Sequence, residues 1–142
     1  MKQALRANKE AQLMRWTHIT LPVSDVDGSV EFFTKVCRLS LIRDRRKEGG
    51  TTLWLGPKPK DGENAEFVLV ISKGKVEVPL DHFGFQCDSY EEFLKIATNA
   101  KESGTLIEEP QDAGGSIGHF FVIREPSGHL VEFTYGQPLE GL

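Results

Sequence analysis

The chain has 142 residues, of which 39% are hydrophobic and 27% are charged, and its formal net charge at pH 7 is -4. These values are typical of one soluble globular domain and exclude a wholly disordered chain. The acidic balance and the lack of a basic face argue against a nucleic-acid partner. No apolar run is long enough for a membrane span. Residues 1–15 lack the apolar segment of a signal peptide, and two cysteines build no disulfide framework, so we expect a cytoplasmic protein.

The first half of the chain has the pattern of a βαβββ unit. Residues 1–15 contain helix formers but few large apolar side chains, and predict an appended arm or helix. Residues 16–23 alternate like a half-buried strand, with His18 and Thr20 on one face. Residues 27–37 have an apolar stripe at helical spacing. Three further strands are expected near 39–45, 51–56 and 65–72.

The second half of the chain has the same order of elements. A strand near 80–87 precedes a helix over about 90–103, which starts with the capping-box pattern Ser89-x-x-Glu92 and stops before Gly104. Three strands are expected near 105–109, 118–124 and 129–135.

An internal repeat joins the two halves. The segment 17–25 is echoed 64 residues later by the segment 81–89, and each copy places a histidine, His18 or His82, early in a strand. Self-similarity at a fixed offset indicates a duplicated structural unit. We therefore predict an α+β fold of two βαβββ modules that form a pseudo-twofold cleft. The expected boundaries are an arm over 1–15, modules over 16–75 and 79–136, and a tail over 137–142.

Two histidines and one carboxylate are the candidate metal ligands. A single strand histidine is more often a surface residue, but the equivalent positions of His18 and His82 favour a shared site. Glu132 follows a Pro-Ser-Gly turn inside otherwise apolar sequence. Two imidazoles and a carboxylate suit a divalent metal with open positions for water and substrate. His119 and His129 lack equivalents in the first unit and are expected at the surface or pocket rim.

The chain resembles the vicinal oxygen chelate superfamily. The resemblance covers residues 16–136 and rests on Leu-Pro-Val-Ser-Asp after His18, Ser-Val-Glu-Phe-Phe over 29–33, the strand led by His82, and Glu-Pro-Ser-Gly-His-Leu-Val-Glu ending at Glu132. That group includes glyoxalase I, methylmalonyl-CoA epimerase, extradiol dioxygenases, fosfomycin-resistance thioltransferases and metal-free bleomycin-binding proteins. The resemblance implies that these three side chains hold a divalent ion, with Fe, Mn, Zn and Ni all possible, and that Glu132 also carries a proton.

The resemblance also implies a fourth ligand on the last strand of the first module. The 64-residue offset maps Glu132 onto Val68, which cannot bind metal. Glu66 lies two residues away on the same face and substitutes only if the strand register differs. The other pocket candidates are strand residues, although aromatic strand residues are more often plain core: Thr20, Trp54, Gln86, Phe121 and Tyr135.

Several functions are compatible with this resemblance. The first is a small metalloenzyme that chelates a vicinal dioxygen substrate, with lyase or isomerase chemistry of the lactoylglutathione lyase kind or ring-cleaving dioxygenase chemistry. Val122 stands where dioxygenases and thioltransferases usually carry tyrosine, which counts against both. The alternative is a metal-free small-molecule binding or resistance protein of the bleomycin-binding type. Relatives of this size commonly form homodimers, some by exchanging modules, so the site lies within one chain or between two.

Overall fold

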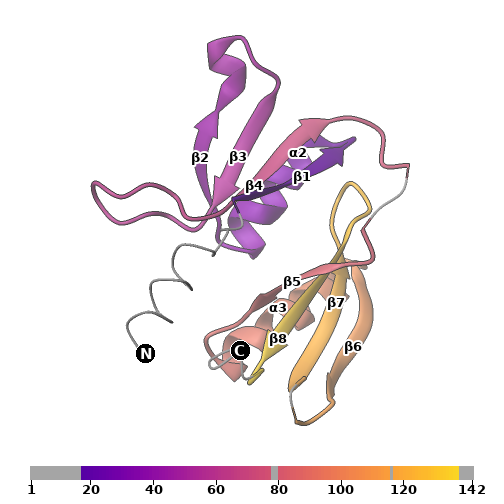
Figure 1. Cartoon of the computed structure of the whole chain (residues 1–142). Helices are drawn as coiled ribbons and strands as arrows, with labels where there is room; N and C mark the ends of the chain where they lie inside the picture. Colours follow the sequence, from indigo (N-terminus) through magenta and orange to yellow (C-terminus); the bar gives the residue numbers. More distant parts are fainter. Residues whose placement is uncertain (1–16, 78–79, 116, 138–142) are drawn as a thin grey trace, which may run out of the picture.

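The computed structural model describes residues 17–77, 80–115 and 117–137 (Figure 1). It contains two four-stranded mixed sheets, with strand orders β1-β4-β3-β2 and β5-β8-β7-β6. The predicted α+β fold of two βαβββ modules is confirmed. The predicted arm and all of the predicted tail beyond Gln137 lie outside the described residues.

Among the described residues, β1 is an edge strand of the first module's sheet. β1 runs parallel to β4, and β3 runs antiparallel to both β4 and β2. β4 starts three residues later than the expected strand over 65–72. The elements in chain order are β1 (His18–Val23), α2 (Val26–Glu31), η1 (Phe32–Val36), β2 (Ser40–Asp44), η2 (Arg45–Glu48), β3 (Thr52–Gly56) and β4 (Val68–Lys73).

The predicted helix over 27–37 is α-helical only in its first half. Its second half, η1, is a π-helix in which the Cys37 N–H donates to the Phe32 carbonyl at 3.3 Å. In this wider turn the adjacent side chains of Phe32 and Phe33 are both buried, with 9% and 0% exposure. The predicted helix over 27–37 is confirmed as a helical segment, but the π-helical geometry of its second half was not predicted.

The second module repeats this topology, and β5 is an edge strand in the part of the chain that the structure describes. β5 runs parallel to β8, and β7 runs antiparallel to β8 and β6. The Ser89 side chain accepts from the Glu92 N–H at 3.1 Å, so the predicted cap of α3 is confirmed. The elements are β5 (Phe83–Gln86), α3 (Tyr90–Glu102), β6 (Leu106–Asp112), β7 (His119–Arg124) and β8 (Leu130–Tyr135).

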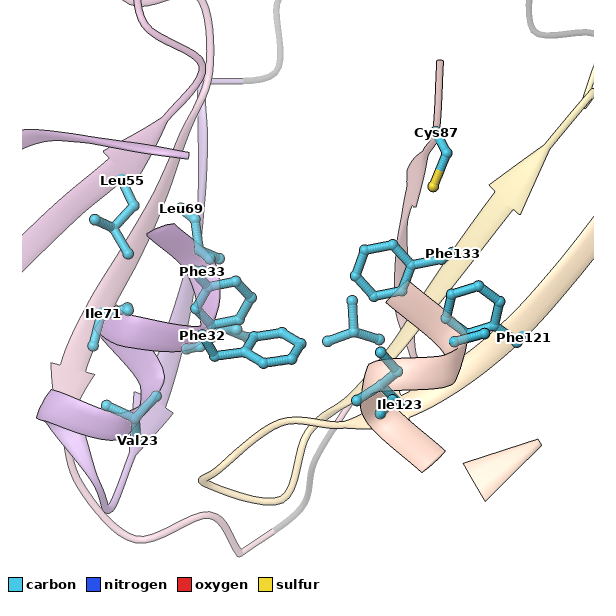
Figure 2. Packing of buried hydrophobic residues seen from close by; sticks show 14 of the residues in the cluster. Val23, Phe32, Phe33, Leu55, Leu69, Ile71, Cys87, Phe121, Ile123 and Phe133 are labelled. Atoms are coloured by element: carbon cyan, nitrogen blue, oxygen red, sulfur yellow. The ribbon is translucent and has the colours of Figure 1, made fainter. Parts of the chain in front are cut away.

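One apolar core joins the two modules. The rings of Phe33 and Phe83 stack with centroids 5.9 Å apart. Figure 2 shows Phe32 and Phe33 of the first module pointing toward Ile123 and Phe133 of the second. The helix-bearing side of each sheet therefore faces this shared core, and the opposite face of each sheet is left outside it. No helix in the described part of the chain has the length and apolar composition needed to cross a membrane.

Candidate functional site

His18 lies on the open face of the first sheet. Its strand alternates, so Leu21 and Val23 are buried in the core while His18 and Thr20 are exposed. The imidazole Nδ1 lies 2.9 Å from the hydroxyl of the preceding Thr17. The Nε2 atom is therefore the nitrogen that remains for a ligand.

His82 and Glu132 meet on the open face of the second sheet. His82 Nε2 lies 3.2 Å from Glu132 Oε2, and His82 Nδ1 lies 2.6 Å from Asp81 Oδ1. Glu132 pairs with Gly84 across β8 and β5. A Cβ on Gly84 would lie 3.1 Å from the Glu132 carbonyl oxygen, so the glycine permits this close approach of the two strands.

His82 has a carboxylate beside each of its two ring nitrogens. In the neutral tautomer whose Nδ1–H donates a hydrogen bond to Asp81 Oδ1, the lone pair of Nε2 is directed toward Glu132. Two lone-pair atoms facing each other are stabilised by a shared proton or by a cation between them. A carboxylate behind the imidazole is the usual second partner of a metal-bound histidine. The pair therefore fits two of the three ligands that the sequence predicts.

The structure does not bring His18 to this pair. Within residues 17–77, 80–115 and 117–137, no group of three His, Cys, Asp or Glu side chains lies close enough to hold one ion. The reason is the contact between modules, which uses η1 and the helix-bearing sides of the sheets, whereas His18 is on the face opposite the core. The described part of one chain therefore contains the His82–Glu132 pair and, apart from it, His18.

The strand register shifts the expected position of the fourth ligand from Val68 to Val70. Thr20 and Gly84 each lie two residues after the histidine of their module, and they pair with Val70 and Glu132 respectively. By register, the counterpart of Glu132 is Val70 and not Val68. Glu66 lies before β4 and is exposed, so it does not replace either valine. Both possible positions for a fourth ligand are apolar.

Three of the pocket candidates lie beside His18. Val68 is its direct neighbour on β4, and Thr20 follows it on β1. Trp54 pairs with Val70 on the same face, with the Arg43 guanidinium 5.7 Å from its ring centroid. This face therefore offers an apolar and aromatic surface next to the histidine.

Gln86 lies on the face of Glu132, but its amide is already engaged. The side-chain oxygen accepts from the Gln137 N–H at 2.9 Å, and the side-chain nitrogen donates to the Gln137 carbonyl at 3.0 Å. Thr134 also donates to this oxygen at 3.3 Å. Gln86 thus holds the chain just after β8 and has little capacity left for a ligand.

Phe121 and Tyr135 do not line the open face, so their prediction as pocket residues needs correction. Phe121 is 0% exposed and stacks on Phe133, with centroids 5.3 Å apart. Tyr135 packs against Tyr90 at 5.6 Å on the core side. The physical reason is the two-residue period of β8, because an outward Glu132 turns its odd-numbered neighbours inward.

His129 is the clearest error of the sequence analysis. It was expected at the surface or pocket rim, but it is 1% exposed. Its Nε2 lies 2.8 Å from the Pro22 carbonyl, in the other module. His119, by contrast, is partly exposed and packs against Tyr90 at 5.1 Å. The missed role of His129 had no signal in the sequence, because its partner is a backbone atom 107 residues away.

The two thiols are poor nucleophiles. Burial, with smaller effects of Cys87 and Glu125, raises the pKa of the Cys37 thiol far above its ordinary value. Burial and the nearby carboxylates of Glu92 and Asp88 raise the pKa of Cys87 to about 11. Both groups are therefore protonated at neutral pH, and neither is suited to thiolate chemistry.

Comparison with known proteins decides the family. Residues 15–133 match the Glyoxalase/Bleomycin resistance protein/Dioxygenase superfamily. The chain belongs to this superfamily. It is 32% identical over 128 residues to a Pseudomonas aeruginosa protein described as uncharacterized, covering 87% of this chain and 89% of that protein. It is 26% identical over 121 residues to a probable lactoylglutathione lyase of Vibrio parahaemolyticus, covering 83% and 88% of the two chains.

Solved structures of superfamily members have the same fold. A possible glyoxalase from Bacillus cereus matches with a TM-score of 0.65 at 30% identity, over 86% of this chain and 99% of that one. The fosfomycin resistance protein FosX from Listeria monocytogenes matches with a TM-score of 0.68 at 20% identity, over 92% and 100%. The second likeness concerns the fold alone.

Proposed function

We propose that this protein is a metal-dependent enzyme that binds a small substrate through two neighbouring oxygens on a divalent ion. His82 and Glu132 supply two ligands, and His18 supplies the third. The observation that supports this most is the 3.2 Å approach of His82 Nε2 to Glu132 Oε2 with Asp81 behind the imidazole. Two histidines and one carboxylate leave coordination positions open for a chelating substrate.

We infer that a second copy of the chain supplies His18. β1 and β5 are both edge strands, and the two histidines lie at the start of β1 and one residue before β5. Pairing β1 of one copy with β5 of another joins the two open faces and brings His18 toward the partner pair. A twofold axis repeats the contact, so the resulting homodimer has two equivalent sites.

The residues around the site suit lyase or isomerase chemistry. A bound divalent ion supplies electrostatic stabilisation of negative charge that develops on substrate oxygen. In this proposal Glu132 accepts a proton from a substrate carbon beside those oxygens and returns it. Val68, Val70 and Trp54 form an apolar wall on the His18 side. The likeness to a probable lactoylglutathione lyase supports this reaction class.

Metal content is the experiment that tests the proposal. Protein purified without chelator is expected to contain one divalent ion per chain by elemental analysis. His82→Ala and Glu132→Ala should each lose most of it, because each removes a ligand. Glu109→Ala removes an exposed carboxylate that forms an ion pair with Lys101, and should retain the metal. Wild-type protein that contains no metal and binds none on titration would contradict the proposal.

The reaction class needs a second measurement. Metal-loaded protein is expected to isomerise a hemithioacetal and to leave catechol rings intact. One observation favours a metal-free binding protein instead, since the described part of one chain gathers no three-ligand group. That alternative predicts quenching of Trp54 fluorescence by an aromatic ligand in chelator-treated protein, with no turnover of either substrate.

A further inference from the structure

A buried polar contact joins the two modules within one chain. Ser29, Glu125 and His129 are each at most 1% exposed. Ser29 donates to Glu125 Oε2 at 2.8 Å, and Glu125 Oε1 accepts from the backbone N–H groups of Ser127 and His129 at 2.7 and 3.1 Å. Ser127 also contacts the Ser29 hydroxyl at 2.8 Å. We refer to Pro22, Ser29, Glu125, Ser127 and His129 as the seam.

The hydrogen bond between His129 and Pro22 connects the chain just before β8, the strand that carries Glu132, to β1, the strand that carries His18. The Pro22 carbonyl accepts, so His129 Nε2 is the donor of this 2.8 Å bond. Pro22 lies in β1, four residues after His18, and His129 lies three residues before Glu132. These distances along extended chain are about 13 Å and about 10 Å. A single hydrogen bond therefore joins β1, the strand of His18, to the residue just before β8, the strand of Glu132.

We propose that His129 is a positioning residue that couples the two metal sites of the dimer. The inference rests on the proposed function. In the dimer, each chain gives His18 to one site and Glu132 to the other. A displacement of β1 at the first site is then carried through His129 to β8 at the second.

Burial makes the connection stiff. If β1 and β8 separate, the His129 imidazole, which is 1% exposed, loses its acceptor while it remains buried, which is unfavourable. The strands therefore move together. Binding of the first ion orders β1 and β8 of each chain. The second ion then binds a site whose conformational entropy is already reduced, so its binding costs less entropy. The expected result is positive cooperativity between the two sites.

Calorimetric titration of the metal-free dimer with Zn²⁺ tests this coupling. In wild type, the second ion should bind at least about fivefold more tightly than the first, after correction for the number of free sites. His129→Leu removes the donor and should make the two affinities equal. His129→Gln keeps an N–H donor at similar reach and should keep the cooperativity. His119→Leu changes a histidine of the same module outside the seam, and should also keep it.

The outcomes separate the coupling from the proposed function. A wild-type dimer that binds none of Zn²⁺, Ni²⁺, Mn²⁺ and Fe²⁺ refutes the proposed function. Zn²⁺ binding at two equal and independent wild-type sites, or full cooperativity in His129→Leu, overturns the coupling alone. If His129→Leu does not fold, Ser127→Ala replaces it, because this change removes one seam contact and should reduce the ratio of the two affinities. An unchanged ratio in Ser127→Ala then overturns the coupling.

Discussion

Asp81 is a surface residue whose carboxylate contacts the imidazole of His82. Its side chain is 95% exposed, yet its carboxylate lies 2.6 Å from His82 Nδ1. In the first module, Thr17 occupies the equivalent position beside His18. In both modules, the residue before the histidine thus contacts its Nδ1, which leaves Nε2 as the nitrogen available to a ligand.

Replacing Asp81 therefore tests whether His82 binds metal. Asp81→Asn removes the charge behind the imidazole and lowers its basicity, and should weaken zinc affinity by about 10- to 100-fold. Competition with a fluorescent chelator measures the change. Glu109→Gln is the matched control, since it neutralises an exposed carboxylate on β6, at the opposite edge of the sheet from β5. Equal affinity in Asp81→Asn and wild type would show that His82 is not a ligand.

Cys37 gives a prediction for stability at alkaline pH. Burial raises the pKa of its thiol in the folded state, whereas the unfolded thiol titrates near 8.5. The unfolded state therefore releases a proton first, and the free energy of unfolding falls as pH rises above this value. The slope for one such group is up to about 1.4 kcal/mol per pH unit.

Urea denaturation between pH 8 and 10 measures this slope. Cys37→Ala removes the titrating group, so its free energy of unfolding should fall less steeply with pH than that of wild type. Tyrosine and lysine titrate in both proteins, and the difference between the two slopes isolates the thiol. Parallel slopes would contradict the role assigned to Cys37.

Individual site residues differed in how far the sequence could predict them. The repeat marked His18 and His82 as equivalent positions, and the two-residue period of strands predicted their faces correctly, while their role as metal ligands stays a prediction. Phe121 and Tyr135 were misplaced because an aromatic strand residue packs equally well in a core or a pocket, and residue type alone does not distinguish them. The role of Asp81 had a signal, namely its place beside a repeated histidine, which the sequence analysis did not use.

At the scale of elements, strand register decides which residues are equivalent. A constant offset along the sequence aligned Glu132 with Val68, but the pairs Thr20–Val70 and Gly84–Glu132 align it with Val70. A constant offset fails because the loops between the strands of the two modules differ in length. The helix over Tyr90–Glu102 was predicted well, since its cap and its stop are local features.

The register predicts which substitution completes a four-ligand site. Val70→Glu should place a carboxylate in the position that Glu132 has in the other module, and should tighten zinc binding by about tenfold or more, equivalent to about 1.4 kcal/mol. Val68→Glu is the matched comparison and should tighten it less. Chelator competition on both dimers gives the two affinities. Tighter binding in Val68→Glu would support the constant offset over the register.

At the scale of the whole molecule, the contact between modules determines where the open faces lie. The repeat predicted two modules, but not that they would pack through η1 and the helix-bearing sides of their sheets. This arrangement depends on contacts between distant residues, such as Phe33 with Phe83 and Ser29 with Glu125. No local pattern reports such pairs, so the sequence left open whether the site lies within one chain.

Mixing two defective variants tests whether a site is shared. His18→Ala and Glu132→Ala homodimers should each bind little metal, because every site lacks one ligand. After mixed refolding, a heterodimer contains one intact site, with His18 from one chain and Glu132 from the other. About a quarter of all sites are then restored, on the simple statistics of random pairing into closed twofold dimers. Elemental analysis that shows no recovery would place the whole site within one chain.

The two unpaired sheet edges also bear on how the protein assembles. β1 and β5 each present a row of backbone groups without a neighbouring strand in the described part of the chain. Two chains can close a ring through these edges, but β1 of a second chain can equally receive β5 of a third. The same edges that allow a closed pair therefore allow an open-ended polymer. Crowded refolding, in which many chains meet before any ring has closed, is the condition that favours fibre growth.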